Sequence, residues 1–97
     1  MFARLFQFQL KSDKIDEAVT RFRESIIPAV KPEKGLISYS VLLDRNTGKG
    51  ATIIYFDTEE NMLANESSGL PQKMRDEFKD YWAGQYIVDR YEVCAQI

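Results

Sequence analysis

The sequence contains no histidine and only one cysteine, Cys94. Without histidine the chain lacks a Ser-His or Cys-His nucleophile pair, a His-based zinc site and a proximal-His haem ligand. One cysteine by itself forms neither an internal disulfide nor a Cys-based zinc site. We therefore expect no metal site and no catalysis of the types that depend on histidine.

An excess of charge and a long hydrophobic run are also missing. The chain has 13 Lys and Arg against 15 Asp and Glu, a net charge of −2, which gives no electrostatic reason to bind nucleic acid or an anionic membrane. No run approaches the ~18 apolar residues of a membrane span. Arg4, Gln7 and Gln9 interrupt the apolar start, so it does not resemble a signal peptide. We expect a soluble cytoplasmic protein with no nucleic-acid or membrane partner.

The length of 97 residues and a hydrophobic fraction of 44% are typical of one globular domain with a single core, spanning residues 1–97. No internal repeat or linker divides it.

Residues 35–57 read as a β-hairpin. Residues 36–43 and 51–56 are rich in β-branched and aromatic side chains, and the segment between them has turn chemistry. Asp44 and Asn46 can bond their own backbone, and Gly48 and Gly50 tolerate positive φ. One face of the first strand is predicted to hold Ile37, Tyr39, Val41 and Leu43.

The second strand of this hairpin is apolar on both faces, with Ile53 and Tyr55 on one and Ile54 and Phe56 on the other. A sheet with one wet face would alternate apolar with polar residues. We therefore expect both sides of the sheet to be covered.

The segment before the hairpin predicts a strand and a helix. Residues 2–10 alternate, with Phe2, Arg4, Phe6, Phe8 and Leu10 on one face. Ser12 or Asp13 is the predicted N-cap of a helix whose apolar stripe is Ile15, Ala18, Val19, Phe22 and Ile26. Pro28 and Pro32 are predicted to end this helix.

The segment after the hairpin predicts two shorter helices and a last strand. Thr58 is the expected N-cap of a helix over residues 59–67, and Pro71 suits the first turn of the next one. Gly84 is a natural stop for that helix, and residues 86–95 alternate as a strand. The order β-α-β-β-α-β predicts a ferredoxin-like α+β fold, with a four-stranded antiparallel sheet and helices on one face.

Two segments carry a resemblance to a known family. They are Pro32-Glu33-Lys34-Gly35-Leu36-Ile37-Ser38-Tyr39 and Tyr55-Phe56-Asp57-Thr58-Glu59-Glu60. With the order of elements around them, they resemble the antibiotic-biosynthesis-monooxygenase-like domains of the dimeric α+β barrel group, over nearly the whole chain. The resemblance implies a homodimer whose sheets face each other, with a pocket between sheet and helices in each subunit.

Characterised members of that family include oxygenases of phenolic polycycles that need no metal or flavin, and others degrade haem. This chain has Phe56 where the family often has Trp, and Asn65 where many members have His. Haem degraders also use an Asn on the first strand, which residues 2–10 lack. The absence of histidine argues against haem degradation here.

The resemblance implies candidate site residues, each with a plainer alternative. Tyr39, Tyr55 and Asn65 are candidate catalytic residues, because a hydroxyl or amide can orient a phenolic substrate and stabilise its anion. Phe56 and Trp82 are candidate pocket walls. Packing alone also accounts for the tyrosines and for Trp82, and a solvated position accounts for Asn65.

Two functions follow as expectations. The first is a cofactor-independent monooxygenase acting on a small aromatic or phenolic substrate; the alternative is a non-catalytic dimeric module that binds a small ligand. A pocket that is open and partly polar favours the first, and one filled by Phe and Met favours the second. In both cases we expect a homodimer through the sheet face away from the helices, since the last strand stays apolar through Val93, Ala95 and Ile97.

Overall fold

The computed structural model describes all 97 residues. It has a four-stranded antiparallel sheet in the order β2-β3-β1-β4, which confirms the ferredoxin-like prediction. The elements in chain order are β1 (Phe2–Gln9), α1 (Ile15–Arg21), the π-helical η1 (Phe22–Ile26), α2 (Ile27–Val30), β2 (Leu36–Leu43), β3 (Lys49–Phe56), α3 (Glu59–Ser67), α4 (Leu70–Glu77) and β4 (Ile87–Glu92).

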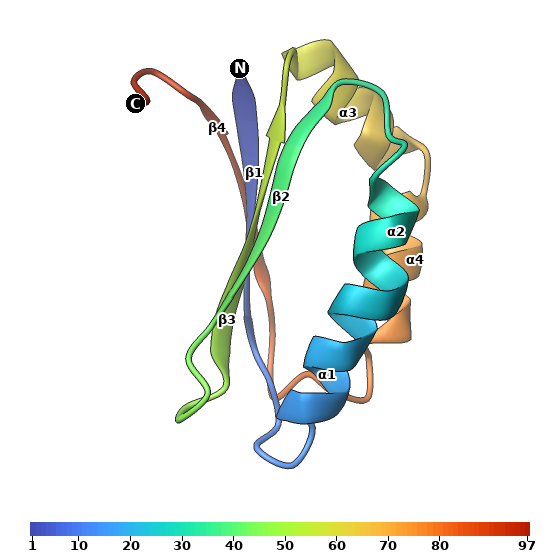
Figure 1. The fold of residues 1–97 in the computed structure, drawn as a ribbon, viewed down its shortest axis with the longest axis vertical. Helices are drawn as coiled ribbons and strands as arrows, with labels where there is room; N and C mark the ends of the chain where they lie inside the picture. The colour runs from blue at the N-terminus through green and yellow to red at the C-terminus, as the bar shows by residue number, and fades with distance from the viewer.

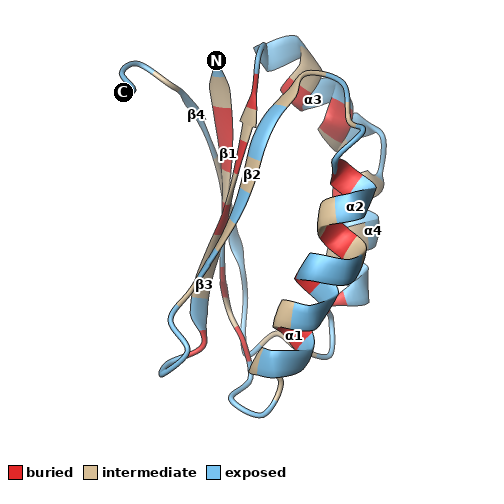
Figure 2. Ribbon diagram, viewed as in Figure 1, coloured by how far each residue is buried: buried red, intermediate tan, exposed pale blue.

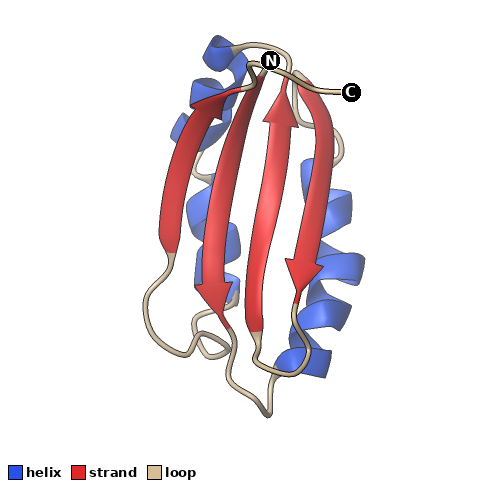
Figure 3. Cartoon of the chain, turned by 90° about the vertical axis from the view of Figure 1, so that its left-hand side faces the viewer, coloured by secondary structure: helices blue, strands red, loops and turns tan.

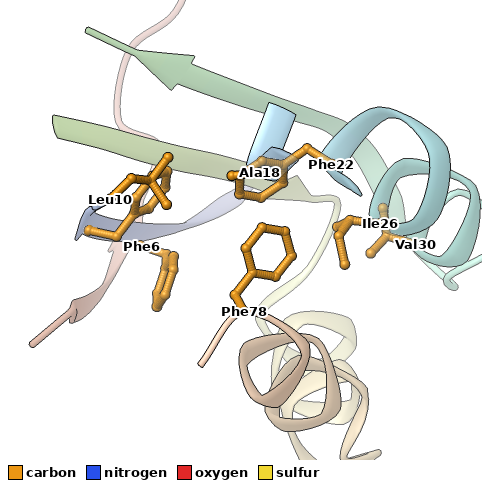
Figure 4. Packing of buried hydrophobic residues seen from close by; sticks show 8 residues of the cluster. Phe6, Leu10, Ala18, Phe22, Ile26, Val30 and Phe78 are labelled. Carbon is orange, nitrogen blue, oxygen red and sulfur yellow. The ribbon is translucent and has the colours of Figure 1, made fainter. Parts of the chain in front are cut away.

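All the helices lie on one side of the sheet, and the other side has no layer over it (Figures 1 and 3). The buried residues gather between these two layers (Figure 2). The main core cluster is Phe6, Phe8, Leu10, Ala18, Phe22, Ile26, Val30 and Phe78. Figure 4 shows Phe78, which directly follows α4, pointing toward Phe22 and Ile26 of η1.

The first helical segment departs from the prediction at both ends. It begins at Ile15 after a turn in which the Lys14 N–H bonds the Lys11 carbonyl, so neither Ser12 nor Asp13 caps it. It continues through Pro28 to Val30. Proline has no N–H for the bond of an α-helical turn. The π-helical turn just before Pro28 has wider spacing, and the helix passes this position without ending.

The hairpin forms as predicted, with two corrections. Leu36 lies opposite Phe56 and Ser38 opposite Tyr55, so Ile37 is an extra residue, a β-bulge, and is exposed. The prediction that Ile37 shares a face with Tyr39 is therefore wrong.

The second correction concerns the glycines. Gly48 has the expected positive φ, but Gly50 lies in β3 without one. A Cβ on Gly50 would lie 2.4 Å from the Phe8 ring on the neighbouring strand. Gly50 is therefore needed for a close approach and not for the turn.

The two segments that carry the family resemblance meet at one junction. The Asp57 N–H donates to the Gly35 carbonyl at 2.9 Å, and Asn61 Nδ2 donates to Asp57 Oδ1 at 2.8 Å. Thr58 accepts from the Asn61 N–H, which confirms it as the cap of α3. At Gly35, with φ +79°, a Cβ would lie 2.4 Å from Asp57 Oδ1. The shared pattern thus describes how β2, β3 and α3 are joined.

The last third of the chain follows the prediction for α3 and for Pro71 in the first turn of α4. However, α4 ends at Glu77 and does not reach Gly84. The Lys11 N–H bonds the Tyr81 carbonyl and the Ala83 N–H bonds the Gln9 carbonyl, so the backbone here extends β1 and cannot be helical. The last strand is shorter than predicted.

Candidate functional site

A small cavity lies between the sheet and the helices, where the family resemblance implies a pocket. Its volume is about 50 Å³, well below the roughly 150 Å³ of an apolar cavity that holds benzene. An aromatic ring therefore enters only if lining side chains move. The lining residues are Arg4, Phe6, Phe22, Ile26, Tyr39, Thr52, Ile54, Pro71, Met74, Arg75, Phe78, Trp82 and Val88.

The structure separates the five residues predicted from the sequence. Tyr39 and Trp82 line the cavity. Phe56 and Asn65 lie in an adjoining, closely packed region that shares Arg4 and Tyr39 with the cavity wall. Tyr55 pairs with Ala3 and Ser38 on the opposite face of the sheet, away from the cavity.

A buried arginine joins these two regions. Arg4 comes from the helix-facing side of β1 and is only 4% exposed. Its Nη2 donates to Asn65 Oδ1 at 2.7 Å, and its guanidinium lies 5.5 Å from the centre of the Phe56 ring. Phe56 and Asn65 therefore contact Arg4, and Arg4 in turn borders the cavity.

The charge of Arg4 is incompletely compensated. Burial lowers the pKa of the guanidinium, and the Glu66 carboxylate opposes that change. Arginine nevertheless stays protonated in proteins. Glu66 Oε1 lies 3.5 Å from Arg4 Nη1 but accepts its hydrogen bond from Arg90, at 2.6 Å. Nη1 is buried and has no hydrogen-bond partner.

Asn65 is buried, which rules out the solvated position. Its Oδ1 accepts from Arg4 and its Nδ2 donates to Glu33. Both ends of the amide are occupied, so the arrangement suits Asn65 to hold the Arg4 guanidinium in place.

Tyr39 is held in its protonated form. Burial raises its pKa to about 12, and the Thr52 hydroxyl and the Arg4 charge only partly offset this. A phenol with that pKa donates a hydrogen bond at neutral pH and does not act as a base. No carboxylate lines the cavity, so its polar wall consists mainly of donors.

Trp82 combines packing with a position in the cavity wall. Its ring stacks on Phe78 at 5.3 Å with an interplanar angle of 19°, and it meets the edge of Phe6 at 5.6 Å. Offset-stacked and edge-to-face contacts are the favourable aromatic geometries. The same cluster offers an aromatic surface to a flat ligand.

Sequence reasoning missed Arg4 and Arg75 as site residues. The signal for Arg4 was present, because it is the one charged residue on a strand face otherwise made of Phe2, Phe6, Phe8 and Leu10. A lone charge on a core-facing strand position is either paired or functional. Arg75 gives no comparable signal, since it follows Met74 on a mostly polar helix.

Comparison with known proteins gives relatives in sequence and in structure. No family model matches the chain. Two uncharacterised proteins of Mycobacterium tuberculosis are each 28% identical over 95 residues, which is 98% of this chain and 42% of the relative. The chain therefore spans less than half the length of the curated relatives it matches.

Solved structures identify the fold. A Nitrosomonas europaea protein, whose name gives antibiotic biosynthesis monooxygenase as a candidate activity, has a TM-score of 0.80 at 16% identity, over 98% of this chain and all of the other. A Streptomyces coelicolor monooxygenase in complex with the ligand nanaomycin D has a TM-score of 0.81 at 10% identity, over 99% of this chain and 89% of the other. The chain has the antibiotic-biosynthesis-monooxygenase-like fold. None of its helices is long and apolar enough to cross a bilayer.

Proposed function

We propose that this domain, which has the antibiotic-biosynthesis-monooxygenase-like fold, binds a small phenolic molecule in the cavity and oxygenates it without a metal or flavin. The observation that carries the proposal is the buried Arg4 charge beside the Tyr39 hydroxyl at the wall of an apolar, aromatic cavity. A mostly apolar site with a few placed polar groups suits a flat aromatic molecule. The names of the structural neighbours support the same reaction class.

The chemistry requires an electron-rich substrate anion, because no cofactor supplies electrons. The Arg4 charge favours the phenolate, whose proton goes to water, and the protonated Tyr39 donates a hydrogen bond to the same anion. The phenolate then reduces O₂. Overall, a CH₂ carbon of the ring system becomes a carbonyl, one oxygen atom enters that carbonyl, and the other leaves with the two hydrogens as water.

The size of the cavity sets a condition on this proposal. Met74, Arg75, Trp82 and Val88 are only partly buried, so the cavity approaches the surface on their side. Met74 is unbranched and adapts easily. Entry of a substrate requires side chains on this side, such as Met74, to move outward, while the Arg4 end stays fixed by Asn65.

A second candidate is a non-catalytic module that binds a small ligand. The observation that favours it is the small volume, about 50 Å³, that the Phe, Met and Trp side chains lining the cavity leave open. The two candidates share the binding site and differ only in whether O₂ is consumed.

For both candidate functions we propose a homodimer through the open face of the sheet, the face away from the helices, and a cytoplasmic location. Large side chains on this face are exposed although nothing in the subunit packs on them, namely Leu42, Ile87 and Tyr91. Leu5, Ile53 and Tyr55 lie between them in the register. An apolar patch of this kind marks an interaction surface, and a stable interface would bury about 1,000 Å² or more.

The test of the function is oxygen uptake by metal-free protein supplied with anthrone- or naphthol-type phenols. We expect uptake above that in buffer, reduced by Tyr39→Phe and Asn65→Ala. Tyr55→Phe is the matched control, since it removes the same hydroxyl from the opposite face. Uptake no greater than in buffer, or equal in all variants, would reject the oxygenase site; saturable binding without uptake would support the binding module.

A further inference from the structure

The geometry points to a more specific ligand: we propose that the cavity takes a small aromatic acid whose carboxylate is held by Arg4 and Arg75. The inference rests on the proposed function in one respect, namely that the cavity is the ligand site. It adds the class of ligand and two residues that select it.

The first observation is the free donor on Arg4. Its Nη1 is buried and lacks a hydrogen-bond partner, although the side chain itself is almost fully enclosed. Glu66 Oε1, 3.5 Å away, offsets part of the charge but makes no hydrogen bond to Nη1, so an arriving anion could still supply the missing acceptor. The Nη2 contact with Asn65 fixes the plane of the guanidinium, so Nη1 is presented in a defined direction.

The second observation is a matching free donor on Arg75, across the same cavity wall on α4. Its Nε is also buried without a partner. The rest of this guanidinium is occupied elsewhere: Nη2 donates to Gln72 at 3.1 Å, and the group lies 5.6 Å from the centre of the Tyr86 ring. Two different arginines thus each leave one N–H for a ligand.

The third observation is the local charge. Besides burial, the nearby positive charges of Arg90 and Arg75 lower the pKa of Arg4, so each of these two groups lies close enough to Arg4 to repel it. Glu66 is shared between Arg4 and Arg90, and Glu33 bonds Asn65. Glu66 lies beside Arg4 but does not line the cavity, and no other carboxylate does, so a ligand anion would add negative charge on the cavity side.

The two free nitrogens, Arg4 Nη1 and Arg75 Nε, can take a carboxylate while Tyr39 serves the phenolic oxygen of the proposed substrate. A carboxylate has two oxygens, so it can accept one charge-assisted hydrogen bond from each of the two guanidiniums. The remainder of the cavity is apolar and aromatic and suits a ring. Tyr39 is left to bond a hydroxyl on that ring.

The experiment compares benzoate with benzamide, its neutral analogue of similar shape, by calorimetric titration of the whole chain. We expect benzoate to bind at least about tenfold more tightly than benzamide. Arg75→Gln should lower benzoate affinity by about tenfold or more and leave benzamide unchanged. Arg23→Gln is the matched control, because Arg23 is exposed on η1 and forms none of the ion pairs.

Arg4→Gln is expected to abolish the preference for benzoate, and a thermal melt checks that this core variant folds. If it does not fold, Arg75→Gln alone decides the matter. Equal affinity for the two ligands, no benzoate binding, or full benzoate affinity in Arg75→Gln would overturn the inference. Oxygen uptake with uncharged phenols would then still support the oxygenase proposal. A benzoate preference without oxygen uptake would instead support the aromatic-acid site and reject the oxygenase.

Discussion

The two faces of the sheet are built from alternate residues of the same strands but differ in what covers them. On β3, Thr52, Ile54 and Phe56 face the helices and are buried, whereas Ile53 and Tyr55 face the open side and are only partly buried. The helix side holds the core, the buried Arg4 and the cavity. Neighbouring residues on one strand therefore report on two different surfaces, which can be perturbed separately.

The largest expected effect comes from the helix side of β3. Phe56→Ala removes a side chain that is 1% exposed, and we expect it to lower the free energy of unfolding by about 3–5 kcal/mol. Its neighbour Tyr55→Ala should cost less than half as much for dilute subunits. Urea denaturation of both variants at low protein concentration measures the difference; equal losses would show that the open face is as well packed as the core.

Tyr39 gives the next effect, and it depends on pH. The fold favours the neutral phenol, whose pKa rises from 10.0 to about 12. The free energy of unfolding that this preference for the neutral phenol contributes is complete below pH 10 and is lost as the pH rises through about 12. The free energy of unfolding should fall by up to about 3 kcal/mol more in the wild type than in Tyr39→Phe over that range. Identical pH profiles for the two proteins would mean that Tyr39 is not shielded from water.

Asn65→Ala tests the polar part of the helix side. It leaves Arg4 Nη2 without its acceptor in a buried position, and we expect a loss of about 1–3 kcal/mol in the free energy of unfolding. Asn61→Ala is a control one turn earlier on the same helix, where the partly buried Asn61 donates an exposed hydrogen bond to Asp57. An Asn65 variant as stable as wild type would show that water replaces the amide.

The smallest effect on the subunit is expected on the open face. Tyr91→Asp replaces an exposed tyrosine and should change subunit stability by less than about 1 kcal/mol, yet it should disrupt association. Equilibrium sedimentation at micromolar concentration should give twice the 11.2 kDa chain mass for the wild type and the single-chain mass for the variant. A wild type that sediments only as single chains would defeat the dimer proposal.

Much of this fold can be predicted from local patterns. The alternation in residues 2–10, the turn chemistry around Gly48 and the Thr58 cap act over a few residues, and the structure confirms them. The predictions from local patterns fail where a contact with a residue distant in the sequence determines the local structure. Gly50 is fixed by Phe8 on another strand, and the end of α4 is fixed by backbone bonds from residues 81 and 83 to the start of the chain.

The site is less predictable for the same reason. Tyr39 and Trp82 were identified through the family resemblance, and the register of β3 is what turns Tyr55 to the other face. Asn65 looks solvated in its polar segment, but Arg4, 61 positions earlier in the chain, buries and bonds it. Arg90 likewise pairs with Glu66 on α3, 24 positions earlier in the chain.

Both candidate functions place a phenolic ligand on the helix side of the sheet, beside Arg4 and the single tryptophan, Trp82. The indole N–H of Trp82 gives one signal in a proton–nitrogen NMR spectrum, so titration with 1-naphthol follows the cavity directly. We expect this signal to shift and to saturate with the ligand, and the shift to be weaker in Tyr39→Phe but not in Tyr55→Phe. A Trp82 signal that stays unmoved while ligand binds, with shifts confined to Ile87 and Tyr91 of the open face, would contradict it.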